Sequence, residues 1–127
     1  MVQVSSDGEQ VDVEAATGEH YHARAALLAT GSTYRRTGAP GEDDLIGAGI
    51  HFCATCDGAF YRGKRVVVIG GGNSAGEESV FLTRFAEHVT VVTRDDALTA
   101  SKVVVAKLEE HPAIDVVTAA NPVGFAT

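Results

Sequence analysis

The chain has 127 residues, a formal net charge of −7 at pH 7 and a hydrophobic content of 45%. This composition is typical of a soluble globular protein of about one domain. The negative net charge, with no block of Lys or Arg, argues against binding nucleic acid or an anionic membrane. No window approaches the roughly 18 consecutive apolar residues of a membrane span, and residues 1–7 do not resemble a signal peptide. We therefore expect a cytoplasmic protein without nucleic-acid or membrane partners.

The first thirty residues predict an antiparallel β-meander. Short runs of alternating apolar and polar residues are separated by the turn signals Asp7-Gly8 and Thr17-Gly18. The apolar residues 25–29 then predict a buried strand that ends in the small-residue turn Thr30-Gly31-Ser32. Such a turn offers backbone N–H groups to a ligand, although the same residues also suit a plain tight turn out of a sheet.

The pattern changes along the rest of the chain from a connector to βαβ units. Turn-forming residues between positions 32 and 50 predict the connector, with a domain boundary near residue 49. The β-branched run at 66–69 is typical of a central parallel strand that is buried on both faces. The expected elements after it are a helix at about 74–86, a strand at 88–93, a helix at 101–110 and a strand at 114–117.

A glycine-rich turn follows the strand at 66–69. Gly70-x-Gly72-x-x-Ala75 fits the dinucleotide-binding fingerprint in its expected place, after a strand and at the start of a helix. The first glycine permits the tight turn, and the missing side chain at Gly72 lets backbone N–H groups approach a pyrophosphate. The small Ala75 allows close packing of helix and strand. The pattern predicts a dinucleotide site; the alternative is a turn that serves packing alone.

The residues after the second strand of this unit bear on the choice of nucleotide. An acidic side chain there binds the 2′-hydroxyl of NAD, whereas arginine neutralises the 2′-phosphate of NADP. Arg94 favours the phosphate, and Asp95 and Asp96 disfavour it. The sequence therefore leaves NADPH and NADH both open.

Cys53 and Cys56 are the only cysteines, and two residues separate them. A disulfide across so short a loop adds little stability and is typically labile, so the pair favours redox chemistry. The alternatives are half of a zinc site, for which only His51 lies close in sequence, and two reduced cysteines that serve packing. In a redox exchange Asp57 is placed to accept or deliver the proton, unless it is only a turn residue. Beside a nucleotide turn, the pair predicts electron transfer between a nicotinamide and a disulfide.

These residues carry a resemblance to a known family. The segment from His51 through Cys53-Ala54-Thr55-Cys56-Asp57-Gly58 to Tyr61, together with residues 70–75, resembles the low-molecular-weight thioredoxin reductases, which are class II pyridine nucleotide-disulfide oxidoreductases. Ala29-Thr30-Gly31-Ser32 and Pro40-Gly41-Glu42 are similar to further motifs of that family.

The resemblance implies an α/β fold, a Rossmann-like three-layer FAD/NAD(P)-binding fold. Residues 1–48 would be a β-meander and connector from the FAD domain. Residues 49–127 would be an incomplete NAD(P)H-binding domain that carries the CxxC redox site. The full-length family implies a homodimer.

The resemblance also implies a flavin-dependent thioredoxin-disulfide reductase. Electrons would pass from NAD(P)H through FAD to the Cys53–Cys56 disulfide, and on to thioredoxin or a similar small dithiol protein. Asp57 would protonate the departing thiolate, with Cys56 nearer the flavin and Cys53 meeting thioredoxin. The residues implied to hold cofactors are Thr30 and Gly31 for FAD and, for the nucleotide, Gly70, Gly72, Asn73, Ser74, Ala75, Thr93, Arg94 and Asp95.

Two departures from the family pattern qualify this expectation. NADPH-dependent members carry a His-Arg-Arg run and a further Arg where this chain has Thr93-Arg94-Asp95 and Thr99, so NADH or another electron donor is an alternative. The N-terminal FAD fingerprint and the second half of the nucleotide domain have no counterpart, so we expect an internal fragment that is inactive alone and binds FAD poorly. A non-catalytic redox or nucleotide-binding module is the remaining alternative.

Overall fold

The computed structural model describes residues 3–127, and the chain divides into two compact units, residues 1–34 and 35–127. The connector thus packs with the second unit, whereas the sequence places a domain boundary at residue 49. The assignment of residues 1–48 and 49–127 to two cofactor domains stays a prediction. Each unit is described by itself.

The first unit is the expected antiparallel meander, with strand order β1-β2-β3. Its strands are β1 (Gln3–Ser6), β2 (Val11–Glu14) and β3 (His20–Ala23). The two hairpin turns contain Gly8 and Gly18, which have φ angles of 99° and 84°, a region that glycine enters without strain. The meander predicted from the alternation is confirmed.

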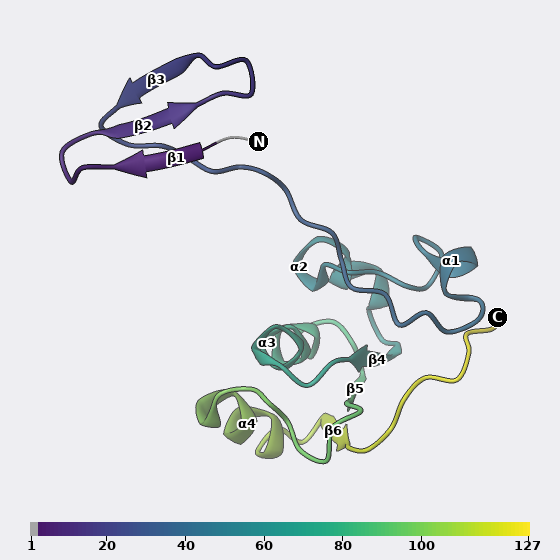
Figure 1. The fold of residues 1–127 in the computed structure, drawn as a ribbon. Coiled ribbons are helices and arrows are strands. Elements are labelled where there is room, and N and C mark those ends of the chain that lie inside the picture. The colour runs from purple at the N-terminus through teal and green to yellow at the C-terminus, as the bar shows by residue number, and fades with distance from the viewer. Residues whose placement is uncertain (1–2) are drawn as a thin grey trace. The chain divides into compact units, whose positions relative to one another are not determined.

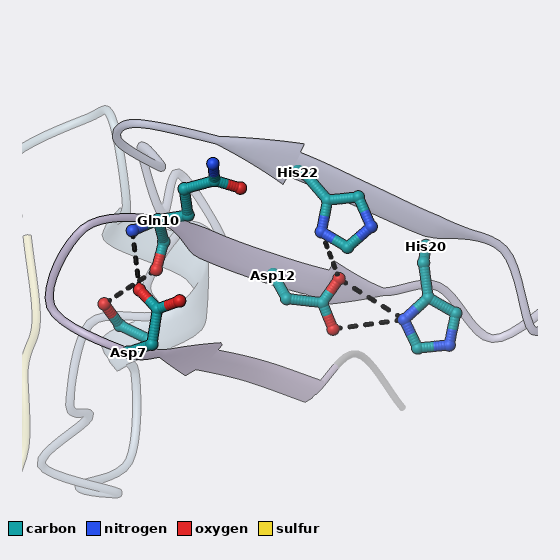
Figure 2. A network of polar contacts seen from close by, with 6 residues as sticks. Asp7, Gln10, Asp12, His20 and His22 are labelled. Atoms are coloured by element: carbon teal, nitrogen blue, oxygen red, sulfur yellow. Dashed lines mark hydrogen bonds and ion pairs between the residues drawn. The ribbon is translucent and has the colours of Figure 1, made fainter.

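Two aspartates hold this meander together through polar contacts (Figure 2). In the first hairpin, Oδ1 of Asp7 accepts hydrogen bonds from the backbone N–H groups of Glu9 and Gln10. The bond from Gln10 is the main cause that lowers the pKa of Asp7 below its ordinary 3.8. On the sheet, Asp12 lies 3.1 Å from Nδ1 of both His20 and His22. These exposed contacts accompany the backbone pairing of β2 with β3.

The prediction of a buried strand at residues 25–29 is wrong. The chain from residue 25 to residue 39 has no regular secondary structure, and Leu27 is 92% exposed. A strand needs a partner for its backbone N–H and C=O groups, and none of the described strands pairs with this segment.

The second unit contains a parallel sheet with strand order β4-β5-β6 and two crossover helices. Its sheet elements are β4 (Arg65–Ile69), α3 (Asn73–Leu82), β5 (His88–Val92), α4 (Lys102–Glu109) and β6 (Ile114–Val117). Both helices lie on the same side of the sheet (Figure 1). The three strands and two helices lie where the sequence predicts them, except that α3 ends about one turn early, at Leu82.

The core of this unit lies between the two helices and the central strand. Val89 and Val91 of β5 are fully buried, as is Leu108 of α4. Helices α3 and α4 approach closely at Gly76, since a Cβ atom there would collide with Cγ1 of Val104. Burial of these apolar side chains stabilises the unit and fixes the position of α3, whose first turn follows the glycine-rich loop.

Strand β4 is not the doubly buried central strand that its β-branched run predicts. It is an edge strand, and Val67 and Ile69 are 60% and 43% exposed. The alternating Val66 and Val68 pack against the core, and both helices lie on one side of the sheet, so Val67 and Ile69 lie on the face without helices.

Three short helices precede β4, namely α1 (Glu42–Leu45), α2 (Ala54–Asp57) and the 3₁₀ helix η1 (Gly58–Tyr61). The connector is held by the buried carboxylate of Glu42, which accepts hydrogen bonds from the backbone N–H groups of Thr37 and Gly38. The bond from Thr37 is the main cause that lowers the pKa of Glu42 below its ordinary 4.5. Within the described residues, no helix has the length and apolar character needed to cross a membrane.

Candidate functional site: a disulfide beside a glycine-rich turn

Cys53 and Cys56 form a disulfide at the start of α2. Cys53 is the N-cap residue, with extended backbone angles, and its Sγ accepts a hydrogen bond of 3.2 Å from the backbone N–H of Cys56. The two-residue spacer brings the Cα atoms to 5.3 Å, a normal separation for a disulfide. Of the three interpretations of the cysteine pair, the disulfide excludes two reduced cysteines that serve packing.

Helix α2 is too short to be stable alone, and contacts with α3 hold it in place. The carboxylate of Glu78 accepts a hydrogen bond of 3.4 Å from the backbone N–H of Ala54. At the other end, a Cβ atom on Gly58 would lie 3.2 Å from Leu82 and 3.4 Å from Phe85, so only glycine fits without displacement. The disulfide is therefore anchored to the helix that follows the glycine-rich turn.

Asp57 follows the second cysteine and faces a histidine. Its Oδ2 atom lies 3.1 Å from Nδ1 of His51, and both side chains are mostly buried. The His51 ring packs edge-on against Tyr61 at 5.5 Å, and the Tyr61 hydroxyl donates a hydrogen bond to the Gly49 carbonyl. Burial, with the charge of Asp57 as a smaller cause, raises the pKa of Tyr61 above its ordinary 10.0. From the sequence, His51 is a candidate only as a zinc ligand. Its contact with Asp57 could not be predicted, because it depends on how the chain wraps around α2.

The glycine-rich turn has a distinct role for each glycine of the fingerprint. Gly70 has a φ of 148°, and a Cβ atom there would lie 3.1 Å from that of Ala75. Gly72 is the N-cap residue of α3, and a Cβ atom there would meet nothing within 4 Å. Open space in front of a helix N-terminus suits an anion such as a pyrophosphate. Asn73, Ser74 and Ala75 form the first turn of this helix.

Sequence reasoning missed how the turn is tied to the loop before α4. The Gly71 carbonyl accepts hydrogen bonds from the backbone N–H groups of Thr99 and Ala100. The side-chain oxygen of Asn73 accepts a further bond, of 2.7 Å, from the N–H of Ser101. A Cβ atom on Gly71 would lie 2.5 Å from Oγ1 of Thr93, which explains why the middle residue of the run, outside the fingerprint, is also glycine. The only sign of these contacts in the sequence is Gly71, a glycine that the fingerprint does not require.

Comparison with known proteins identifies the family. The family model described as pyridine nucleotide-disulphide oxidoreductase matches residues 1–127. The chain belongs to this family. It is 47% identical over 109 residues to the thioredoxin reductase of Bacillus subtilis, covering 86% of this chain and 34% of that protein. It is also 47% identical over 115 residues to the bifunctional thioredoxin reductase/thioredoxin of Mycobacterium leprae, covering 91% of this chain and 25% of that protein.

Solved structures of the same family have the same fold. The thioredoxin reductase of Giardia duodenalis superposes with a TM-score of 0.73 and 36% identity, covering 92% of this chain and 38% of that one. The resemblance to thioredoxin reductases inferred from the sequence is therefore confirmed. The chain spans between a quarter and about a third of the length of these two curated relatives.

The residues that the sequence associates with nucleotide choice follow the end of β5. The Thr93 side chain is buried there and its Oγ1 accepts a bond of 3.4 Å from the Asp95 backbone N–H. Nε of Arg94 lies 3.8 Å from Oδ1 of Asp95, and both side chains are at least half exposed. An acidic side chain thus lies beside the guanidinium at this position.

The remaining predicted site residues and the zinc alternative are placed as follows. Thr30 and Gly31 lie in the exposed segment of the first unit, where Gly31 has a φ of 76° and open space around it. The structure gives them no position relative to the glycine-rich turn. Among residues 3–127, no group of three or more His, Cys, Asp or Glu side chains could hold a metal ion.

Proposed function

We propose that the chain is the dithiol-bearing part of a flavin-dependent thioredoxin-disulfide reductase. Electrons pass from NAD(P)H through FAD to the Cys53–Cys56 disulfide, and on to thioredoxin or a similar small dithiol protein. The observation that carries the proposal is a disulfide at a helix N-terminus, packed on the helix that follows a dinucleotide-type turn. Membership of the disulphide oxidoreductase family supports it.

In this proposal the cysteines and the aspartate have separate roles. Cys53 is the nucleophile that meets thioredoxin, and Cys56 lies nearer the flavin and resolves the mixed disulfide. Asp57 protonates the departing thiolate, a role supported by its position directly after Cys56 and by its mostly buried carboxylate.

The cofactor residues divide between the two parts of the chain in the proposed Rossmann-like three-layer fold. Residues 1–48 belong to an FAD domain, where Thr30 and Gly31 lie by the flavin; residues 49–127 form the nucleotide domain. Bound FAD would supply a two-electron relay between a nicotinamide and the disulfide. The residues proposed to hold the nucleotide are Gly70, Gly72, Asn73, Ser74, Ala75, Thr93, Arg94 and Asp95. The full-length protein is proposed to be a homodimer in the cytoplasm.

The contact between Arg94 and Asp95 favours a second candidate for the electron donor. With its guanidinium 3.8 Å from a carboxylate, Arg94 offers less positive charge to a 2′-phosphate than an unpaired arginine would. NADH, or a donor other than a nicotinamide, is therefore an alternative to NADPH. Separate titrations of the chain with NADPH and NADH distinguish these cases: equal affinity supports NADH use, and a strong preference for NADPH removes the alternative.

Trapping the mixed disulfide tests the proposed division of labour. The Cys56→Ser and Cys53→Ser variants are matched, because each keeps one thiol on the same helix. They are mixed with a thioredoxin that retains only its attacking cysteine, activated as a mixed disulfide with an aromatic thiol. We expect a covalent complex with the Cys56→Ser variant and little with Cys53→Ser. Equal yields would contradict the assignment, and no complex with either variant would contradict the proposed partner.

A further inference from the structure

The contact between His51 and Asp57 adds a residue to the proposed dithiol chemistry. Nδ1 of His51 lies 3.1 Å from Oδ2 of Asp57, and the exposed fractions of the two side chains are 21% and 28%. The two residues flank the disulfide in sequence, and Asp57 is the last residue of the short helix α2.

The surroundings keep the imidazole in place. Its ring packs against Tyr61 at 5.5 Å and Phe60 at 6.4 Å. The chain before it is fixed by a backbone hydrogen bond from Ile50 to Leu45. The charged or titratable groups of neighbouring elements are Tyr61 on η1, Glu78 on α3, which accepts from the Ala54 N–H, and Arg36, which lies over the Phe52 ring.

We propose that His51 is a positioning residue that stores, at Asp57, the proton used in dithiol exchange. An aspartate of ordinary acidity is almost fully ionised at pH 7 and seldom holds a proton to give. Histidine is the side chain best suited to exchange protons near neutral pH, so an imidazole against the carboxylate gives the pair a group that can take up and return a proton. This inference rests on the proposed dithiol function and names how its proton is held.

The proton and electron balance of the exchange closes with this assignment. When the Cys53 thiol ionises, its proton moves to the His51–Asp57 pair. The Cys53 thiolate attacks the substrate disulfide, forming one S–S bond and expelling a thiolate, which takes that proton through Asp57. The Cys56 sulfur then attacks Cys53, re-forming the intramolecular disulfide, and the proton of the Cys56 thiol passes to the second thiolate. Two electrons and two protons move from the dithiol to the substrate.

The test uses the full chain after reduction by a phosphine, and two substrates that differ in their need for a proton. The alkyl substrate, bis(2-hydroxyethyl) disulfide, expels a strongly basic thiolate, whereas 5,5′-dithiobis(2-nitrobenzoate) expels a weakly basic one. His51→Asn leaves an amide near the position of Nδ1 but cannot titrate. We expect it to slow the alkyl reaction about tenfold at pH 7, less than the roughly hundredfold or greater loss of a complete acid catalyst because Asp57 remains, and the aromatic reaction less than about twofold.

A matched control is available in the same chain. His88 and Asp115 form another histidine–aspartate pair, at 2.9 Å through Nε2, on β5 and β6. His88→Gln should leave both rates unchanged. In the parent chain the ratio of alkyl to aromatic rate should fall as the pH rises from about 6 to about 8, and it should be flat in His51→Asn.

Several results would overturn the inference. One is that His51→Asn reacts with both substrates as fast as the parent chain. Another is that both reactions are slowed equally. The third is that the ratio of alkyl to aromatic rate depends on pH in His51→Asn as it does in the parent. The Asp57→Asn variant provides an independent check, because the double variant with His51→Asn should be no slower than Asp57→Asn alone, and additive losses would contradict a shared path. If the reduced parent chain reacts with neither disulfide, the proposed function itself fails.

Discussion

Replacing Gly72 with alanine separates the binding role of the glycine-rich turn from its structural role. Gly72 has φ −89° and ψ −178°, which alanine adopts without strain, and an added Cβ atom meets nothing within 4 Å. Alanine lowers the entropy of the unfolded chain, a gain of about 0.4–1 kcal/mol, but is a poorer N-cap residue by a similar amount. We therefore expect the free energy of unfolding to stay within about 0.5 kcal/mol of the parent.

Nucleotide affinity should respond differently to the same substitution. The new methyl group occupies the open space in front of the α3 N-terminus, where the backbone would approach a pyrophosphate. We expect the dissociation constant for the chain's preferred nucleotide to rise at least about tenfold, or about 1.4 kcal/mol. Urea denaturation and calorimetric titration with NADPH and NADH measure the two quantities on one preparation.

Gly76→Ala is the matched control, since its Cβ atom would collide with Val104 inside the fold. Overpacking of about 1–3 kcal/mol, less a helix-propensity gain of about 1 kcal/mol, predicts a net loss of about 1 kcal/mol in stability. The residual folded protein should bind nucleotide as the parent does. The reasoning is refuted if Gly72→Ala binds nucleotide normally, or if it destabilises the chain more than Gly76→Ala.

Three further predictions concern stability, each followed by thermal or urea denaturation. Gly70→Ala should cost about 1–3 kcal/mol, because φ of 148° strains alanine and its Cβ would crowd Ala75; a neutral effect would mean that the turn adapts. Leu108→Ala should cost about 2–5 kcal/mol, because Leu108 is fully buried; a loss under 1 kcal/mol would contradict a packed α3–α4 core. The pKa of Glu42 is lowered in the folded chain, chiefly by the Thr37 N–H. The stability that its carboxylate contributes is therefore complete above pH 4.5 and is lost as the pH falls through the lowered pKa of the folded state. The stability gap between the parent and Glu42→Gln should therefore narrow on acidification below pH 4.5, and a constant gap would be evidence against it.

Local patterns predicted most of the second unit because its elements are stabilised by contacts that the sequence itself specifies. The β-branched run before Gly70 and the glycine fingerprint after it define β4 and the start of α3. The same run did not show that β4 is an edge strand, since its residues are equally suited to burial on one face or two. Whether a face is covered depends on the rest of the fold.

The wrong prediction at residues 25–29 and the missed contact of His51 have a common physical cause: both depend on how other parts of the chain are placed. An apolar stretch becomes a strand only if another strand satisfies its backbone, and Leu27 has no such partner in the described chain. His51 is paired with Asp57 because the chain turns around α2, which no periodicity in the sequence encodes. By contrast, the disulfide between Cys53 and Cys56 was predictable, since a two-residue spacer on one helical turn brings the cysteines together.

The most direct test of the proposed function follows the exchange between the Cys53–Cys56 pair and thioredoxin in the reverse direction. The oxidised chain is mixed with an excess of reduced thioredoxin, the thiols are alkylated after a short interval, and the mass of the chain is measured. Dithiol exchange predicts that Cys53 and Cys56 both become alkylated, faster than with an equal concentration of reduced glutathione. A disulfide that stays intact with thioredoxin, or that reacts no faster than with glutathione, would contradict the account.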